Sequence, residues 1–185
     1  MRIEQTPIEG LVIIHPTLFL DDRGYFFEKF NEAKFADLYG RAIHFVQDNQ
    51  AKSTKNVLRG LHFQKGEFAQ AKLVSAIAGT VLDVAVDIRP DSVTYGKHYS
   101  IILSAENKIQ LFVPRGFAHG YAVLSDEAEF FYKCDNYYKK DAEGGLAYNC
   151  PILNIDWNMD LKDAIISEKD LLHPNINEYT STLNS

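Results

Sequence analysis

Residues 72–88 read KLVSAIAGTVLDVAVDI, two apolar runs separated by Gly79. Branched apolar side chains favour β-strands, and each run has the length of one strand. The second run, VLDVAVDI, alternates only in part and is mostly apolar, as expected for a strand that is covered on both faces. We therefore predict strands over 71–78 and 80–88, with a turn at Gly79, in the middle of a β-rich fold.

Short strands are also expected on both sides of this pair. Turn residues in RPDSVTYG, SAEN, PRG and SDE recur at the spacing of an all-β sandwich or barrel. Upstream, LVIIHPTLFL and GYFFEKF flank a DDRG turn and indicate two more strands. The other predicted strands span roughly 44–50, 57–64, 98–104, 108–113, 119–124 and 127–135.

Helix is scarce in this pattern. Asn31 is expected to cap a helix over EAKFADLY that Gly40 ends, and Ser167 is expected to cap a short turn at EKDLL. Because many short strands need closure to hide their edges, we predict an all-β, cupin-like jelly-roll barrel with a few short helices. The mouth of such a barrel can hold a ligand. With no repeat or linker, residues 1–185 are expected to form a single domain.

The composition limits the classes of partner. The chain is 46% hydrophobic and 24% charged, and its formal net charge of −6 disfavours nucleic-acid binding without excluding an anionic small ligand. No apolar run is long enough to span a membrane and the first residues lack an export signal, so we expect a cytoplasmic protein. Cys134 and Cys150 are then expected to be free thiols.

Polar residues within the apolar strands are the first candidates for function. Gln47 and Asn49 share strand parity and are expected to face one side, while Lys72, His119 and Tyr132 lie within otherwise apolar runs. Taken singly, each fits a structural role, as an edge polar group, a snorkelling lysine, or a satisfied core histidine or tyrosine. Their coincidence on successive strands of one barrel predicts an active site.

The stretch RGLHFQ, residues 59–64, presents a difficulty of parity. Strict alternation puts Arg59 and His62 on opposite faces of a strand. Gly60 offers a solution, because a glycine within a strand often marks a bulge that re-aims its neighbours. Either the strand is irregular at Gly60, or one of the two polar residues lies outside the pocket.

Several kinds of chemistry lack a signal. The six histidines include no H-x-H or H-x-x-x-H pair, so we expect no metal site. No serine or cysteine lies in a nucleophile elbow, and no glycine-rich loop is typical of phosphate binding. Acid/base chemistry on a bound, anionic ligand is the interpretation that remains.

The motifs RGLHFQ, QAKLV, VLDVAVDIR, LSAEN, VPRGFAHGYAVLSDEAEFFYK and SEKD follow one another in order between about Gly10 and Leu171. In this order and spacing they resemble the dTDP-4-dehydrorhamnose 3,5-epimerases. The resemblance implies a homodimeric, cupin-like jelly roll that needs no metal or organic cofactor. The implied substrate is a dTDP-linked 4-keto-6-deoxy sugar, dTDP-4-dehydro-6-deoxy-D-glucose, which is epimerised at C3 and C5 on the route to dTDP-L-rhamnose.

The resemblance also implies roles for single residues. His62 would be the base, paired with Asp170, and Tyr132 the acid that delivers a proton from the opposite face of the sugar. Lys72 would lie beside the C4 oxygen. The remaining implied contacts are Arg23, Arg59 and Lys169 at the diphosphate, Tyr138 against the thymine, and Glu28, Gln47, Asp48, Asn49, His119 and Glu143 at nucleotide or sugar.

Some of these residues also fit purely structural roles. Ser167 to Asp170 reads S-x-x-D, close to a capping box, which gives Asp170 a competing role at the start of a turn. Arg23 could be a solvated turn residue and Lys169 a surface charge, and Glu143 falls in what looks like an exposed loop.

The function also has alternatives. These are an epimerase acting at C3 alone, a ketoisomerase that moves the carbonyl from C4 to C3, and a nucleotide-sugar binding module without catalysis. Deuterium incorporation from solvent and the loss of turnover in His62→Ala distinguish them.

Overall fold

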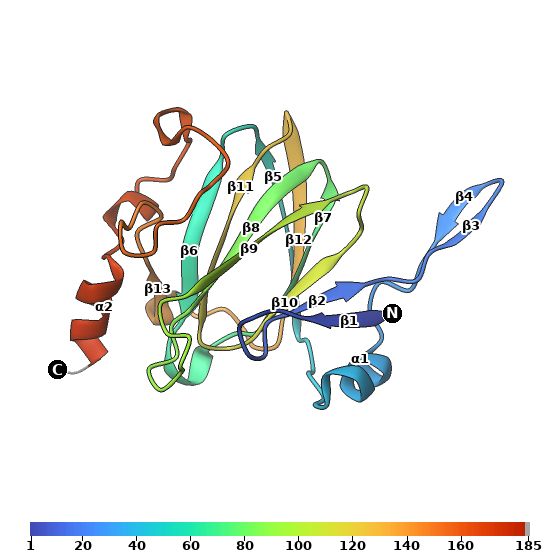
Figure 1. Cartoon of the computed structure of the whole chain (residues 1–185), viewed down its shortest axis with the longest axis horizontal. Helices are drawn as coiled ribbons and strands as arrows, with labels where there is room; N and C mark the ends of the chain where they lie inside the picture. The colour runs from blue at the N-terminus through green and yellow to red at the C-terminus, as the bar shows by residue number, and fades with distance from the viewer. Residues whose placement is uncertain (184–185) are drawn as a thin grey trace.

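The computed structural model describes residues 1–183 and contains two antiparallel sheets that face each other (Figure 1). The six-stranded sheet has the order β1-β2-β10-β7-β12-β5 and the five-stranded sheet the order β13-β6-β11-β8-β9. Strands of the first sheet are β1 (Arg2–Gln5), β2 (Val12–His15), β10 (Gln110–Val113), β7 (Lys72–Ala78), β12 (Glu127–Cys134) and β5 (Gln47–Thr54). Strands of the second sheet are β13 (Glu143–Gly145), β6 (Leu58–Gln64), β11 (Phe117–Val123), β8 (Thr80–Asp87) and β9 (His98–Ser104).

The main core lies between the two sheets. It contains Val74 and Phe130 from the six-stranded sheet and Ala85, Leu103 and Tyr121 from the five-stranded sheet. The rings of Tyr121 and Phe130 stack with centroids 4.1 Å apart. This packing of two multi-stranded antiparallel sheets confirms the predicted all-β, cupin-like jelly roll.

Both sheets are also covered on their outer faces. The helix α1 (Glu32–Tyr39) packs Phe35 against the six-stranded sheet, next to Phe112 and Val12. The chain after β13 covers the five-stranded sheet, where Trp157 and Leu146 are buried against the outer face. The predicted double coverage of β8 is therefore confirmed, because all of its residues after Thr80 are buried.

The predicted helix over EAKFADLY is confirmed with both of its caps. The Asn31 side chain accepts a hydrogen bond from the backbone N–H of Lys34, and Gly40 adopts a left-handed φ of 83°. The sequence interpretation missed α2 (Ile176–Leu183). Short 3-10 turns occur at η1 (Gly66–Phe68), η2 (Lys140–Ala142), η3 (Leu161–Asp163) and η4 (Asp170–Leu172).

The predicted strands are confirmed with two corrections, and β1 and β13 were not predicted. The strand expected at 44–50 is β5, which begins at Gln47 and continues to Thr54. The run LVIIHPTLFL is not one strand, since it divides around Pro16 into β2 and the short β3 (Phe19–Asp21). Cys134 and Cys150 are buried free thiols, as expected.

A hairpin of β3 and β4 (Gly24–Phe26) projects away from the sandwich at the right of Figure 1. We call residues 18–26 the arm. Its apolar side chains are exposed to an unusual extent, reaching 78% for Leu20 and 69% for Phe26. Within residues 1–183, no helix combines the length and apolarity needed to cross a bilayer.

Candidate active site

A cavity of about 500 Å³ is lined by strands of both sheets and by residues of the segment 165–170. Four elements place polar side chains in it: Lys72 on β7, Tyr132 on β12, His62 on β6 and His119 on β11. Arg59, Ser167, Lys169 and Asp170 also contribute polar groups to its lining. A smaller adjoining cavity of about 240 Å³ shares part of this lining, namely His62, Lys72 and Tyr132, and adds Gln47, Asn49, Tyr138 and Glu143.

The predicted irregularity at Gly60 is confirmed, and it brings Arg59 and His62 to the same cavity. Opposite β11, Arg59 pairs with Tyr121 and His62 with His119, so three steps along β6 match two along β11. Gly60 has a φ of 128°, and a Cβ there would lie 2.6 Å from Cα of Gly120. Only glycine fits this position, which explains the glycine inside an otherwise strand-like motif.

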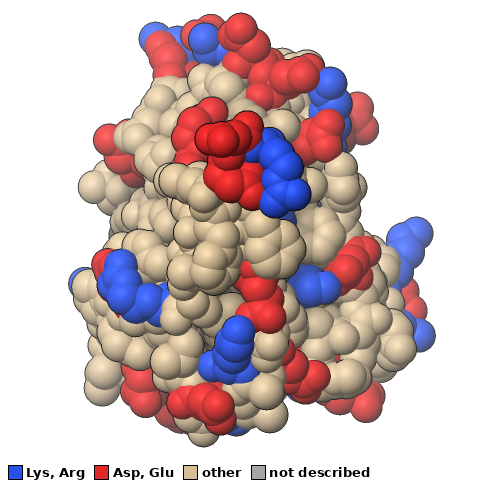
Figure 2. Space-filling view, turned by 90° about the vertical axis from the view of Figure 1, so that its right-hand side faces the viewer, with Lys and Arg blue, Asp and Glu red and all other residues tan. Residues whose placement is uncertain are grey.

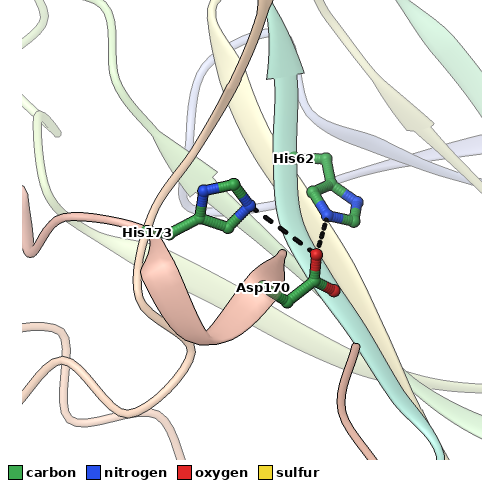
Figure 3. A group of neighbouring side chains, drawn as sticks. All are labelled: His62, Asp170 and His173. Atoms are coloured by element: carbon green, nitrogen blue, oxygen red, sulfur yellow. Dashed lines mark hydrogen bonds and ion pairs between the residues drawn. The ribbon is translucent and has the colours of Figure 1, made fainter. Parts of the chain in front are cut away.

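His62 and Asp170 form a hydrogen-bonded pair (Figure 3). Nε2 of His62 lies 2.7 Å from Oδ1 of Asp170, while Oδ2 accepts the backbone N–H of Gly60 at 3.1 Å. Burial opposes ionisation of Asp170, but the hydrogen bonds and charge of His62, with those from Gly60 and Ser167, outweigh it and lower the pKa of Asp170 to about 2. The carboxylate therefore holds a proton on Nε2 and leaves Nδ1 as the basic nitrogen.

The capping role considered for Asp170 accounts for its backbone contact but not for its side chain. The backbone N–H of Asp170 donates to Oγ of Ser167 at 3.2 Å, as in a capped turn. The carboxylate, however, turns to His62 and Gly60 and makes no reciprocal bond to Ser167 N–H among the described contacts. The turn positions the residue, and its side chain belongs to the cavity.

Tyr132 and Lys72 lie next to each other on neighbouring strands. Nζ of Lys72 is 5.8 Å from the centroid of the Tyr132 ring. Burial is the main cause that raises the pKa of Tyr132 to about 12, so this phenol keeps its proton at working pH. Burial also lowers the pKa of Lys72, against the attraction of Cys134, Asp83 and Glu143. A proton donor and a poorly solvated amine therefore share the cavity with the His62 imidazole.

A second histidine pair was missed by the sequence interpretation. Nε2 of His119 lies 2.9 Å from Oδ2 of Asp83, and both residues are buried. Asp83 stands in VLDVAVDI as an acidic residue among apolar ones, and that contrast was a usable signal. His119 lines the cavity with this carboxylate behind it.

The nucleotide-contact candidates gather around the adjoining cavity. Gln47 and Asn49 are hydrogen-bonded to each other at 3.0 Å and line it together, which confirms their shared face. The hydroxyl of Tyr138 donates to Oε2 of Glu143 at 3.0 Å, and Glu143 forms an ion pair with Lys169. These last contacts join the two cavities along one rim.

Three candidates lie outside both cavities of the chain. Asp48 points to the opposite side of β5 and binds Lys133 at 2.7 Å. Arg23 lies in the arm with its side chain 90% exposed, and Glu28 pairs with Lys34 near the start of α1. Within one chain, the structure therefore separates these three residues from the other eleven candidates.

His62, Asp170 and His173 place one potential ligand atom each within 4.8 Å of one another. The short contact in this group is a 2.7 Å imidazole–carboxylate hydrogen bond, the separation of two groups that share a proton. The geometry favours proton chemistry for the group. His173 is a further residue that the sequence interpretation did not single out.

Comparison with known proteins identifies the family of this chain. Residues 5–178 match the family model of dTDP-4-dehydrorhamnose 3,5-epimerase. The enzyme of that name from Escherichia coli (strain K12) is 52% identical over 170 residues, 92% of this chain and 91% of its own.

Two solved structures are similar over the whole fold. The dTDP-4-dehydrorhamnose 3,5-epimerase from Elizabethkingia anophelis NUHP1 is 56% identical, with a TM-score of 0.94 over 96% of this chain and 97% of that one. The dTDP-6-deoxy-D-glucose-3,5-epimerase from Legionella pneumophila, solved with dTDP-4-keto-L-rhamnose, is 45% identical, with a TM-score of 0.93 over 98% of this chain and 96% of that one. The chain belongs to the dTDP-4-dehydrorhamnose 3,5-epimerase family.

Proposed function

We propose that this protein is an isomerase that epimerises C3 and C5 of dTDP-4-dehydro-6-deoxy-D-glucose to give dTDP-4-dehydro-L-rhamnose. One observation carries the proposal: an imidazole held by a carboxylate, a protonated phenol and a partly buried amine line the same cavity. We propose that the chain performs this reaction as a single domain.

The chemistry requires these three groups. C3 and C5 both flank the C4 ketone, so removal of either proton gives an enolate whose negative charge develops on one oxygen. Lys72, placed beside that oxygen, stabilises the enolate more than the ketone, and this difference lowers the barrier. His62 removes the proton through Nδ1, and Asp170 stabilises the imidazolium that forms.

Inversion requires that the new proton arrive from the opposite face of the sugar ring. Tyr132 supplies it, since a phenol with a pKa of about 12 is protonated in the resting enzyme. The tyrosinate that remains is close to Nζ of Lys72, whose ring contact is 5.8 Å. No step in this sequence needs a metal or organic cofactor, and we expect activity to survive dialysis against EDTA.

The diphosphate and nucleotide bind along the rim. Arg59 and Lys169 line the main cavity and are placed to neutralise phosphate oxygens. In the adjoining cavity, Tyr138 offers an aromatic face for the base, and Gln47 and Asn49 offer amide groups. His119 and Glu143 contact the sugar or nucleotide from the two cavities they line.

The test is incubation with dTDP-4-dehydro-6-deoxy-D-glucose in heavy water, followed by NMR. Deuterium at both C3 and C5, with the L-configured product, supports the proposal. Deuterium at C3 alone assigns a single-centre epimerase, a 3-keto product assigns a ketoisomerase, and binding without exchange assigns a non-catalytic module.

We further propose that the protein acts as a homodimer in the cytoplasm, with the arm completing the partner's site. Arg23 is a cation that lines neither cavity of its own chain, and it stands on a hairpin with exposed Phe19, Leu20 and Phe26. Figure 2 views the molecule from the arm's side, where broad uncharged areas lie between scattered charges. An apolar hairpin that carries a cation suits a second copy whose cavity binds a diphosphate.

Mixed dimers test this arrangement. Arg23→Ala and His62→Asn are each expected to be inactive, but a dimer with one of each contains one intact site if Arg23 acts in trans. After subunit exchange, activity recovers to about a quarter of the wild-type value, because half of the dimers are mixed and half of their sites intact. No recovery, or a monomer by light scattering, contradicts the arrangement.

A further inference from the structure

His173 approaches the same carboxylate oxygen that binds His62. Its Nε2 lies 3.7 Å from Oδ1 of Asp170, while Nε2 of His62 lies 2.7 Å from that atom. The two imidazole rings meet edge to face, with centroids 5.5 Å apart and an interplanar angle of 79°. Figure 3 shows both rings turned to Asp170, one from each side.

The ring of His173 is held firmly in this place. Gly145 pairs with His62 in the sheet, and a Cβ on Gly145 would lie 2.3 Å from Nε2 of His173. The glycine therefore allows the imidazole to lie directly against the backbone of β13. The side chain of His173 is only 12% exposed, and its Nε2 has no hydrogen-bond partner among the described residues. A buried polar atom without a partner, aimed at a carboxylate, calls for a physical reason.

His173 lines neither of the two cavities described above. It lines a neighbouring hollow that shares Lys169 with the main cavity and Tyr138 and Glu143 with the adjoining cavity. Whatever it does for catalysis, it does through Asp170. The charged groups that face it are His62 on β6, Lys169 just before η4, Asp170 on η4 and Glu143 on β13. The other titratable groups of the hollow are Lys65, Tyr138, Lys140 and Tyr179.

We propose that His173 is a positioning residue that donates its Nε2–H toward Oδ1 of Asp170 and thereby controls how strongly this carboxylate holds His62. The inference rests on the proposed function, in which His62 is the base. A shift of about half an ångström brings the two atoms within hydrogen-bond distance. Burial, together with repulsion from a charged His62, lowers the pKa of His173, so the residue acts as a neutral donor.

A donor on Oδ1 has two consequences. It holds the Asp170 carboxylate from the side opposite His62, so the His62 imidazole keeps its orientation while it takes a proton. It also withdraws some of the negative charge that Asp170 presents to His62, which keeps the basicity of His62 from rising too far. Without the donor, the His62 ring is less firmly oriented and faces a more negative carboxylate.

The test compares His173→Phe, which keeps a ring without a donor, with His173→Gln, which keeps an N–H. In His173→Phe, kcat is expected to fall about tenfold while KM stays within about twofold, as for a lost hydrogen bond to a charged group outside the substrate contacts. The acid limb of kcat/KM and the NMR titration of the His62 ring both move to higher pH. His173→Gln restores most of both values.

Equal losses in the two variants, or an unchanged His62 titration in His173→Phe, overturn the proposal. NMR of the ring nitrogens in the wild-type protein tests it without any substitution: a neutral His173 with its proton on Nε2 is required, and a charged ring or a proton on Nδ1 refutes it. These titrations need no turnover. An inactive wild-type enzyme would therefore contradict the proposed function without deciding the role of His173.

Discussion

Asp170→Asn is the substitution whose effect follows most directly from the geometry. The carboxylate has two fixed partners: Oδ2 accepts the Gly60 N–H at 3.1 Å, and Oδ1 binds Nε2 of His62 at 2.7 Å. An asparagine has one acceptor oxygen. If that oxygen stays with Gly60, the amide NH2 faces His62, whose Nε2 must then accept, and the ring proton moves to Nδ1.

A proton on Nδ1 would abolish the base, because in the proposed mechanism Nδ1 is the nitrogen that takes the substrate proton. The opposite amide orientation is no better, since it sets an NH2 against the Gly60 N–H. We therefore expect kcat to fall by about 10³–10⁴, as in other enzymes where the carboxylate of an imidazole pair becomes an amide and the tautomer is wrong. This corresponds to about 4–5.5 kcal/mol of transition-state stabilisation.

The assay is deuterium exchange at C3 and C5 of the substrate, with dTDP affinity measured alongside to show that the site is intact. Ser167→Ala is the matched control. It removes the hydroxyl that accepts the Asp170 N–H, but the backbone carbonyl of Ser167 still accepts that N–H at 3.0 Å. The control should stay within about threefold of wild type. An Asp170→Asn enzyme within tenfold of wild type, folded and binding dTDP, would show that the tautomer of His62 does not depend on this carboxylate.

Three other predictions address the remaining groups. His62→Asn should block exchange at both carbons, whereas Tyr132→Phe should leave some exchange but no inversion; equal and complete loss of exchange in both would count against opposite faces. Gly60→Ala should lower the free energy of unfolding by about 1–3 kcal/mol more than Gly24→Ala does. Both glycines have a φ near 130°, but a Cβ at Gly60 meets Gly120 at 2.6 Å while one at Gly24 meets nothing within 4 Å; similar denaturation midpoints would contradict the clash. Burial opposes the ionisation of Asp87, but its hydrogen bonds to Arg89, Ser92 and Thr94 lower its pKa from 3.8 to about 2. The stabilisation by ionised Asp87 is thus complete above pH 3.8 and is lost as the pH falls toward 2. The free energy of unfolding of Asp87→Asn should therefore depend less on pH in that window than that of the wild type; an unchanged pH dependence would exclude this contribution.

Much of the barrel could be predicted because its signals are local. Alternation, turn residues and the double coverage of VLDVAVDI all depend on neighbours in sequence. The same holds for α1, whose Asn31 cap and Gly40 stop lie at its ends. The helix α2 had a comparable signal that was passed over: Asn175 accepts the N–H of Glu178, and the Glu178 carboxylate accepts the N–H of Asn175.

The site was harder to predict because its pairs join distant segments. His62 and Asp170 are 108 residues apart, and only the family resemblance suggested their contact. The direction in which the bulge at Gly60 turns the neighbouring side chains also depends on Gly120 in the facing strand. His119 shows the same limitation, since its partner Asp83 lies on another strand and is buried behind it.

The role of Arg23 could not be predicted from local sequence for a different reason. A turn motif such as DDRG fixes a local hairpin, but it says nothing about which cavity the hairpin reaches. In the chain itself Arg23 bonds Asp21 and is otherwise in solvent. Its proposed role depends on a second copy, so neither local pattern nor strand parity could have assigned it.

The proposed mechanism requires an imidazole and a phenol that act on opposite faces of one sugar ring. A crystal structure of the enzyme with a dTDP-linked 4-keto sugar or a stable analogue bound would show their placement. We expect Nδ1 of His62 and the hydroxyl of Tyr132 on opposite faces of the ring, with Nζ of Lys72 at the C4 oxygen. A sugar with both groups on the same face, or one bound outside the cavity that His62 and Tyr132 line, would contradict the proposed mechanism.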